Sequence, residues 1–233
     1  MSAKSFLIPV LLFAATLRVF SADTFVNRLS AKEREAGWKL LFNGKSLEGW
    51  RNYKKPDAPP KGWVVESGYL KLQPKGNGGD IITIEQFTDY DLQWEWRIPA
   101  KANNGVKYLV SETRSAPGPE YQMIDDSLET ESKRMTASLY DILPPAKDKR
   151  VKPFGEWNES RILVRGNHVE HWLNGKKVLA YELGSPELKA AIAQSKFKDV
   201  KDFGEKIKGH VLLTDHLDEV WYRNIKIREL PEK

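Results

Sequence analysis

Short segments of alternating hydrophobic and polar residues recur along the chain between turn-forming residues. They span residues 63–72, 91–98, 106–111, 161–164, 169–173 and 220–227. Alternation with a period of two places successive side chains on opposite faces of a strand, and many short strands between turns are typical of a sandwich or barrel. No long helical pattern competes with these segments, so the pattern predicts an all-β fold.

Local signals predict two further elements. Asn174-Gly175 lies between two alternating runs and predicts a hairpin, because a type I′ turn needs two residues that tolerate positive φ. Ser185 as N-cap and Pro186 at the first helical position predict one short helix near residues 186–196. That helix is expected to cover an edge or an end of the β-structure.

The first 22 residues are predicted to be a secretory signal peptide. Lys4 precedes an apolar run over residues 6–17, and the small residues Ser21 and Ala22 follow. The run is shorter than the about 20 residues that cross a bilayer, so no stable membrane span is expected. The alternative is a buried N-terminal helix. We expect an exported protein, periplasmic or secreted, with a polar leader over residues 23–36 and a single domain over residues 37–231.

Composition narrows the class of protein further. Loss of Lys4 and Arg18 with the signal peptide lowers the formal net charge from +5 to +3. A charge this small and dispersed does not predict nucleic-acid binding. The chain contains no cysteine, which excludes thiol catalysis and disulfides and leaves the aromatic-rich core to hold the fold.

The segment PEYQMIDD, residues 119–126, carries the densest polar chemistry. Glu120, Gln122 and Asp125 combine two carboxylates and an amide, which suits hydrogen bonding to sugar hydroxyls and proton transfer. Alternation predicts that Glu120 and Gln122 share a strand face with Lys107 of the segment NNGVKYLV. A lysine there would stabilise negative charge that develops on a substrate oxygen. The alternative is a polar face that simply meets water.

His216 is the second centre of candidate chemistry. It lies near Asp215 and Asp218, and a carboxylate beside an imidazole favours general acid or base work near neutral pH. A solvated turn histidine is the alternative. The four histidines form no His-Glu-x-x-His or His-x-His pattern, so no dedicated zinc site is indicated. A divalent metal bound by His216 and carboxylates, in place of Lys107, stays an open alternative.

Six segments together resemble the 3-keto-disaccharide hydrolase family, residues 37–50, 103–110, 119–126, 137–145, 152–175 and 209–230. The resemblance implies a concanavalin-like or glucanase-like jelly roll of two antiparallel sheets, with the site on the concave sheet. It also implies an exported enzyme that is paired with a sugar 3-oxidoreductase. The chain departs from the family pattern at Leu217, where a glycine is common. Leucine resists positive φ, so a differently shaped loop is expected around His216.

The resemblance implies cleavage of 3-keto-glucosides or 3-keto-disaccharides by removal of the C2 proton and elimination of the C1 substituent, with hydration as a following step. The strand motif Glu-x-Asp-x-x-Glu of retaining jelly-roll glucanases is absent, which disfavours direct displacement at C1. The catalytic candidates are Glu120 or His216 as base, Lys107 for the enolate oxygen, and Asp125 as acid or as a hydrogen-bond anchor. The candidate contacts to the sugar are Gln122, Glu95, Asn104, Tyr140, His171, Trp172, Trp157 and Asp218.

Two other classes of function compete with this one. A non-catalytic carbohydrate-binding jelly-roll module would need the aromatic rings and amides but no base, since fold does not decide function. A structural envelope protein would need neither. The base, the linkage and the leaving group stay open, and no cofactor is required beyond the metal considered above.

Overall fold

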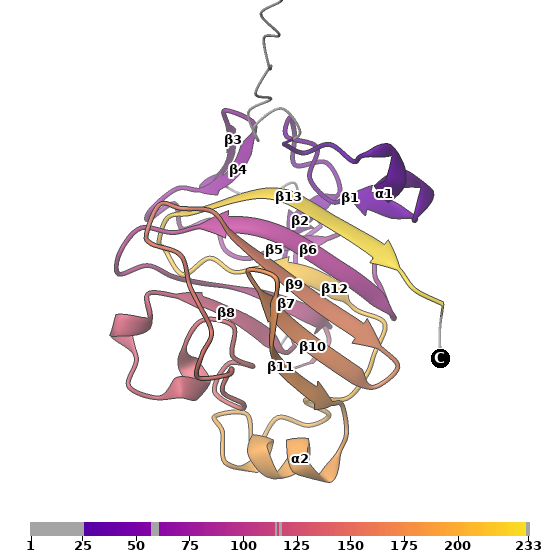
Figure 1. The fold of residues 1–233 in the computed structure, drawn as a ribbon, viewed down its shortest axis with the longest axis vertical. Helices are drawn as coiled ribbons and strands as arrows, with labels where there is room; N and C mark the ends of the chain where they lie inside the picture. Colours follow the sequence, from indigo (N-terminus) through magenta and orange to yellow (C-terminus); the bar gives the residue numbers. More distant parts are fainter. Residues whose placement is uncertain (1–25, 57–60, 115, 117, 232–233) are drawn as a thin grey trace, which may run out of the picture.

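The computed structural model describes residues 26–56, 61–114, 116 and 118–231. The predicted signal peptide lies outside these residues. Two antiparallel sheets dominate the described part of the chain and lie against each other as two layers (Figure 1). The prediction of a two-sheet antiparallel jelly-roll sandwich is therefore confirmed.

The larger sheet has eight strands, and seven of them follow one another side by side. In spatial order these are β11 (Lys176–Glu182), β10 (His168–Leu173), β9 (Asn158–Arg165), β6 (Tyr90–Arg97), β13 (Val220–Glu229), β4 (Tyr69–Leu72) and β3 (Trp63–Glu66). The eighth, β1 (Trp38–Leu40), pairs with β13. Asn174 and Gly175 connect β10 and β11 with φ of 48° and 79°, as the predicted type I′ turn requires.

The smaller sheet has five strands and carries most of the predicted polar chemistry. In spatial order these are β2 (Trp50–Asn52), β5 (Ile81–Thr83), β12 (His210–Leu213), β7 (Asn103–Val110) and β8 (Glu120–Ile124). The central pairings join distant parts of the chain, since Leu212 pairs with Ile82 on one side and with Lys107 on the other.

Helices are few and short. The predicted helix is α2 (Pro186–Ala193), and the Ser185 side chain accepts a hydrogen bond from the Leu188 amide. The sequence analysis missed α1 (Ala31–Glu35), which lies inside the predicted polar leader. Its signal is a capping box between Ser30 and Glu33. Two 3-10 turns follow β8, η2 (Asp126–Leu128) and η3 (Ser132–Arg134).

The core between the sheets is rich in aromatic residues. Trp94 and Trp96 of β6 are 2% and 0% exposed, and Trp94 contacts Tyr121 and Met123 from the smaller sheet. Burial of one such ring removes roughly 150–250 Å² from water and contributes on the order of 4 kcal/mol before entropy is subtracted. This core explains how a chain without cysteine holds its fold.

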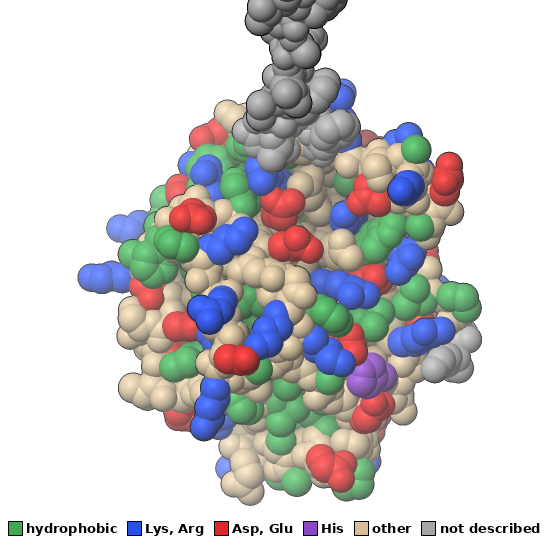
Figure 2. All heavy atoms as spheres, viewed as in Figure 1, with side chains coloured by type: hydrophobic (Ala, Val, Ile, Leu, Met, Phe, Trp, Pro, Cys, Tyr) green, Lys and Arg blue, Asp and Glu red, His purple; other side chains and the backbone are tan. Residues whose placement is uncertain are grey.

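Charges of both signs are mixed on the surface. Lysine and arginine are interspersed with aspartate and glutamate on the face seen in Figure 2, without a large area of one sign.

No helix in the described residues has the length and apolarity needed to cross a membrane.

Candidate active site

The pairing of β7 with β8 brings Lys107 beside Glu120 on the outer face of the smaller sheet. The two residues are direct partners in the antiparallel register, and the Lys107 Nζ lies 3.6 Å from the Glu120 Oε2. Gln122 pairs with Gly105 two positions further along the same face. The expected shared face of Glu120, Gln122 and Lys107 is thus present, and it lies on one of the two sheets as the alternation predicted.

Gly105 makes room for the Glu120 side chain. A Cβ atom at position 105 would lie 2.2 Å from the Glu120 Oε1 and 2.9 Å from its Cδ. The carboxylate therefore lies directly over the Gly105 backbone, a close approach that a residue with a side chain would prevent.

The loop between β12 and β13 adds His216. Its Nε2 lies 3.8 Å from the Glu120 Oε1, and its side chain is 41% exposed, so the cluster meets solvent here. Asp215 anchors the loop, because its carboxylate accepts hydrogen bonds from the amides of Gly78 and Gly79, each at 2.9 Å.

Leu217, in the same loop, corrects an expectation. It adopts a φ of +68°, the left-handed conformation in which glycine is common, so leucine does not prevent that backbone. The conformation costs an ordinary L-residue about 1–2 kcal/mol. The Leu217 amide donates to the Asp215 Oδ1 at 2.9 Å, which helps to hold the strained position.

The electrostatics of the cluster keep Glu120 ionised. Burial alone would raise its pKa, because only 6% of the residue is exposed. The interaction with His216 and the positive charge of Lys107 together outweigh burial, and the net effect lowers the pKa of Glu120 below its ordinary 4.5. Glu120 is therefore a buried carboxylate at neutral pH, which is the state that accepts a proton.

The sequence analysis missed two charged residues near this cluster, Lys196 and Asp80. Lys196 lies in the segment after α2, and its ammonium lies 4.2 Å from the centre of the Tyr140 ring. Burial lowers the pKa of Lys196, although the nearby Glu120 opposes that change. Tyr140 lies beside this group, since its amide donates to the Glu120 carbonyl at 3.0 Å. No local motif marks Lys196, because folding alone brings residue 196 to residue 120.

Asp80 is the second residue that the sequence analysis missed. It directly precedes β5, and its Oδ1 accepts a hydrogen bond from the Asp215 amide at 2.8 Å. Burial raises the pKa of Asp80, and the hydrogen bond from the Asp215 amide and the nearby Lys107 and His216 oppose that rise only in part. Asp80 and Glu120 are thus two carboxyls in one neighbourhood whose pKa values move in opposite directions.

Asp125 and Asp218, two of the predicted site residues, hold backbone in place. The Asp125 carboxylate accepts hydrogen bonds from the amides of Lys101 and Ser127 at 2.9 and 3.0 Å, and these donors lower its pKa. A carboxyl that is stabilised as an anion in this way is a poor proton donor, so its predicted role as the acid is not supported. The Asp218 carboxylate accepts from the Asn103 amide at 2.9 Å.

Asn104 and His171 point into the sandwich, so the prediction that they contact the sugar is wrong. Each is 0% exposed. The Asn104 amide donates to the Asp218 carbonyl at 3.4 Å, and His171 lies against the Tyr108 hydroxyl and the Ala137 carbonyl at 2.7 and 3.1 Å. Both residues share the parity of the buried apolar positions on their strands, which places them on the core face.

Glu95, Trp157 and Trp172 belong to the far side of the molecule. Glu95 accepts from the Arg223 Nε at 2.7 Å, and the Trp157 ring lies 4.3 Å from the same guanidinium. Trp172 donates through its indole nitrogen to Glu170 of its own strand. These side chains occupy the outer face of the larger sheet, and two packed sheets separate them from Glu120, so they do not join its site.

No group of three or more histidine, cysteine, aspartate or glutamate side chains suited to a metal ion occurs among the described residues. The cluster on the smaller sheet contains Glu120, Lys107, Gln122, His216, Tyr140, Asp80 and Lys196. It combines an ionised carboxylate, two ammonium groups and a second carboxyl, which can move protons and stabilise an anion.

Comparison with known proteins identifies the class. Residues 37–228 match the family described as the 3-keto-alpha-glucoside-1,2-lyase-like domain. A 3-keto-disaccharide hydrolase from Bacteroides thetaiotaomicron is 33% identical over 230 residues, which cover 83% of this chain and 79% of that protein. A crystal structure from Parabacteroides distasonis, described as a candidate glycosyl hydrolase, is 34% identical with a TM-score of 0.79, and the match covers 88% and 99% of the two chains.

The fold and the cluster thus define a jelly-roll enzyme of glycosidic bonds. The chain belongs to the 3-keto-alpha-glucoside-1,2-lyase-like family. This membership confirms the resemblance found in the sequence. The exoplasmic domain of VIP36, at 9% identity and a TM-score of 0.50, shares the fold alone, and its match covers 86% of this chain and 90% of that one.

Proposed function

We propose that this protein cleaves 3-keto-disaccharides and related 3-keto-glucosides by removing the C2 proton and eliminating the C1 substituent. The observation that carries the proposal is the buried Glu120 carboxylate, held between Lys107 at 3.6 Å and His216 at 3.8 Å. Family membership and the hydrolase relative support the substrate class.

The chemistry needs little more than these groups. A ketone at C3 acidifies the C2 hydrogen, so a carboxylate of ordinary strength can remove it. The negative charge then rests on the C3 oxygen, where the Lys107 ammonium stabilises it. The C3 carbonyl re-forms as the C1–O bond breaks, which leaves a C1–C2 double bond. Addition of water across that bond completes a net hydrolysis.

Glu120 is the proposed base, because its lowered pKa keeps it ionised at neutral pH. His216 is the rival base, since it is exposed and within 3.8 Å of Glu120. Gln122 and Tyr140 are the proposed contacts to the sugar hydroxyls. Gln122 lies on the same strand as Glu120, and the Tyr140 amide donates to the Glu120 carbonyl.

The experiment that tests this function follows the C2 hydrogen. In heavy water the hydrated 3-keto product should carry deuterium at C2, and a glycoside without the ketone should remain intact. A protein-free incubation controls for spontaneous exchange of the keto sugar. Cleavage with hydrogen retained at C2 would contradict elimination. If no 3-keto-glucoside is cleaved, with or without added divalent metal, the non-catalytic binding module replaces the enzyme.

We infer in addition that the protein is exported and works beside a sugar 3-oxidoreductase. The signal-peptide pattern of residues 1–22 supports export. The substrate supports the pairing, since a ketone at C3 arises by oxidation of a sugar hydroxyl.

Gly105→Ala should reduce kcat/KM on a 3-keto-disaccharide at least about tenfold while the fold is kept. The new methyl group would lie 2.2 Å from the Glu120 Oε1, so the carboxylate must move away from its present position. The clash involves the end of a flexible side chain, so the thermal midpoint should change little. Parent-like kcat/KM in this variant would show that the position of Glu120 is unimportant.

A further inference from the structure

The outer face of the smaller sheet continues from Lys107 across two more strands. Lys107 pairs with Leu212 of β12, and Leu212 pairs with Ile82 of β5. Asp80 lies two residues before Ile82, and a period of two places it on the same face. The register therefore aims the Asp80 carboxyl at the same side of the sheet as Glu120.

The backbone around Asp80 is fixed by mutual hydrogen bonds with the His216 loop. The Asp215 amide donates to the Asp80 Oδ1 at 2.8 Å, while the Asp215 carboxylate accepts from the Gly78 and Gly79 amides. One loop thus positions Asp80 and His216 together. An acid in a site needs this kind of fixed placement.

Charged groups face Asp80 from each neighbouring element. Lys107 of β7 and His216 of the loop favour its anion, whereas Glu120 of β8 opposes it. Burial raises the pKa of the Tyr53 phenol, which follows β2, and the charges of Glu112 and Asp80 add to that rise. Burial prevails and raises the pKa of Asp80, while that of Glu120 is lowered. Two carboxyls with diverging pKa values in one site are the usual arrangement of an acid and a base.

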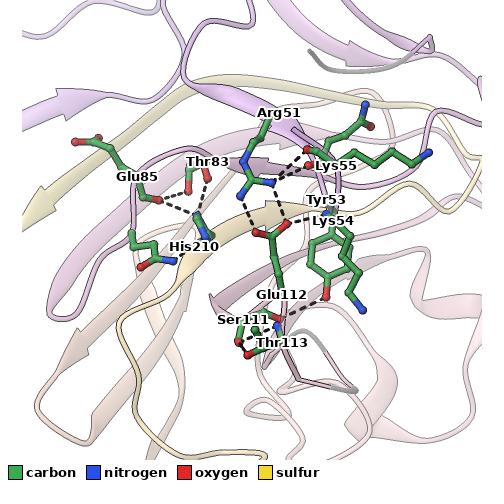
Figure 3. A network of polar contacts seen from close by, with 12 residues as sticks. Arg51, Tyr53, Lys54, Lys55, Thr83, Glu85, Ser111, Glu112, Thr113 and His210 are labelled. Carbon is green, nitrogen blue, oxygen red and sulfur yellow. Dashed lines mark hydrogen bonds and ion pairs between the residues drawn. The ribbon is translucent and has the colours of Figure 1, made fainter. Parts of the chain in front are cut away.

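Beyond Asp80 the face leads to a polar rim. The Tyr53 ring packs on Ile82, Val110 and Leu212, and its hydroxyl reaches the Ser111 carbonyl at 3.4 Å (Figure 3). At the far end the Arg51 guanidinium meets the Glu112 carboxylate through contacts of 2.7 and 2.9 Å (Figure 3). A surface depression lined by Arg51, Glu112 and Ile84, among others, follows. The outer face of the smaller sheet thus runs from Lys107 past Asp80 and Tyr53 to this depression.

We propose that Asp80 is the general acid that protonates the leaving oxygen at C1. The role rests on the proposed function. As the C1–O bond breaks, its electron pair stays on the leaving oxygen, which takes the proton of the Asp80 carboxyl and departs as an alcohol. Glu120 has by then taken the C2 proton. One proton is thus gained by Glu120 and one is lost by Asp80, and exchange with water restores both.

Asp80→Asn tests this role with two substrates. Asparagine keeps an oxygen that accepts the hydrogen bond from the Asp215 amide, but it carries no acidic proton. The variant should lose about 10²-fold in kcat/KM on a 3-keto-disaccharide, whose sugar alkoxide needs protonation. With a 4-nitrophenyl 3-keto-glucoside, whose phenolate leaves without a proton, the loss should be at least tenfold smaller. The parent's activity should also fall as the pH rises through the pKa of Asp80. The pH profile of the variant should lack this fall at high pH.

Incubation in heavy water adds a second measurement, the deuterium content at C2 of the uncleaved substrate. A merely structural role of Asp80 would not raise it. Uncleaved 3-keto-disaccharide incubated with Asp80→Asn should gain deuterium at C2, because Glu120 still removes the proton while departure of the leaving group is blocked. Glu85→Gln, at an exposed carboxylate that pairs with Lys39 of the larger sheet, is the matched control and should behave as the parent does.

Each contrary outcome points to a different error. Equal losses on both substrates, or a high-pH limb that persists in Asp80→Asn, overturn the role of Asp80 and leave the proposed function in place. A parent that exchanges no C2 hydrogen and cleaves neither substrate overturns the proposed function, and the role of Asp80 with it.

Discussion

The Glu120→Gln variant should cleave 3-keto-disaccharides at least about 10²-fold more slowly than the parent. Glutamine keeps the length and hydrogen-bonding reach of the side chain, but it cannot accept the C2 proton. The same variant should incorporate no deuterium at C2 of the substrate in heavy water. Kinetics and mass spectrometry on one set of incubations measure both effects.

Two companion variants make the result specific. Glu85→Gln removes a carboxylate that is exposed and paired with Lys39, and it should retain the parent rate. His216→Asn removes the rival base. If Glu120→Gln exchanges C2 at the parent rate and His216→Asn does not, the base is His216 and the assignment to Glu120 is wrong.

The pH dependence of the parent should agree with Glu120 as the base. A base works in its deprotonated form, and the pKa of Glu120 lies below 4.5 because His216 and Lys107 outweigh burial. Activity should therefore be present above that pKa and fall as the pH drops through it. An acidic limb of kcat/KM above pH 5 would assign the base to another group.

Lowering the pH from 7 to 4 should remove about 3 kcal/mol of the free energy of unfolding through His171 alone. Burial lowers the pKa of His171 from 6.5 to about 4 in the folded protein, and the hydrogen bond with the Ala137 carbonyl opposes this only in part. The unfolded chain therefore takes up a proton first. The contribution is complete above pH 6.5 and is lost progressively as the pH falls toward 4.

Denaturant unfolding at both pH values measures this loss. His171→Gln should be less stable than the parent at pH 7, because the contact with Tyr108 changes, but its pH-dependent loss should be about 3 kcal/mol smaller. The matched control is His168→Gln on the same strand, where Glu182 raises the pKa of the histidine. That control should not reduce the loss. A parent-like pH dependence in His171→Gln would contradict the prediction.

Alternation alone determined much of the smaller sheet. A strand has two faces, and residues two apart share one of them, so Glu120 and Gln122 were bound to lie together in any structure that kept the strand. The hairpin at Asn174-Gly175 and the start of α2 at Ser185 were equally local, because a turn or a cap depends on a few adjacent residues. The same reasoning applied to Ser30 and Glu33 would have found α1.

Parity does not say which face of a strand meets the core, or which sheet the strand joins. Asn104 and His171 face inward because the apolar residues of their strands are buried against the other sheet. Glu95 and Trp157 face outward from the larger sheet, on the side away from Glu120. Sheet packing decided all four positions, and the free energy of burying the apolar faces decides sheet packing.

The sequence by itself determined an all-β chain, the shared face of Glu120 and Gln122, and the family to which they belong. The tertiary structure alone decided which residues surround Glu120. Asp80 and Lys196 reach the cluster through β-pairing and a long segment that folds back, so their positions depend on contacts between distant parts of the chain. A side chain's neighbours across strands follow from strand order and register, which are properties of the whole sheet and of no single segment.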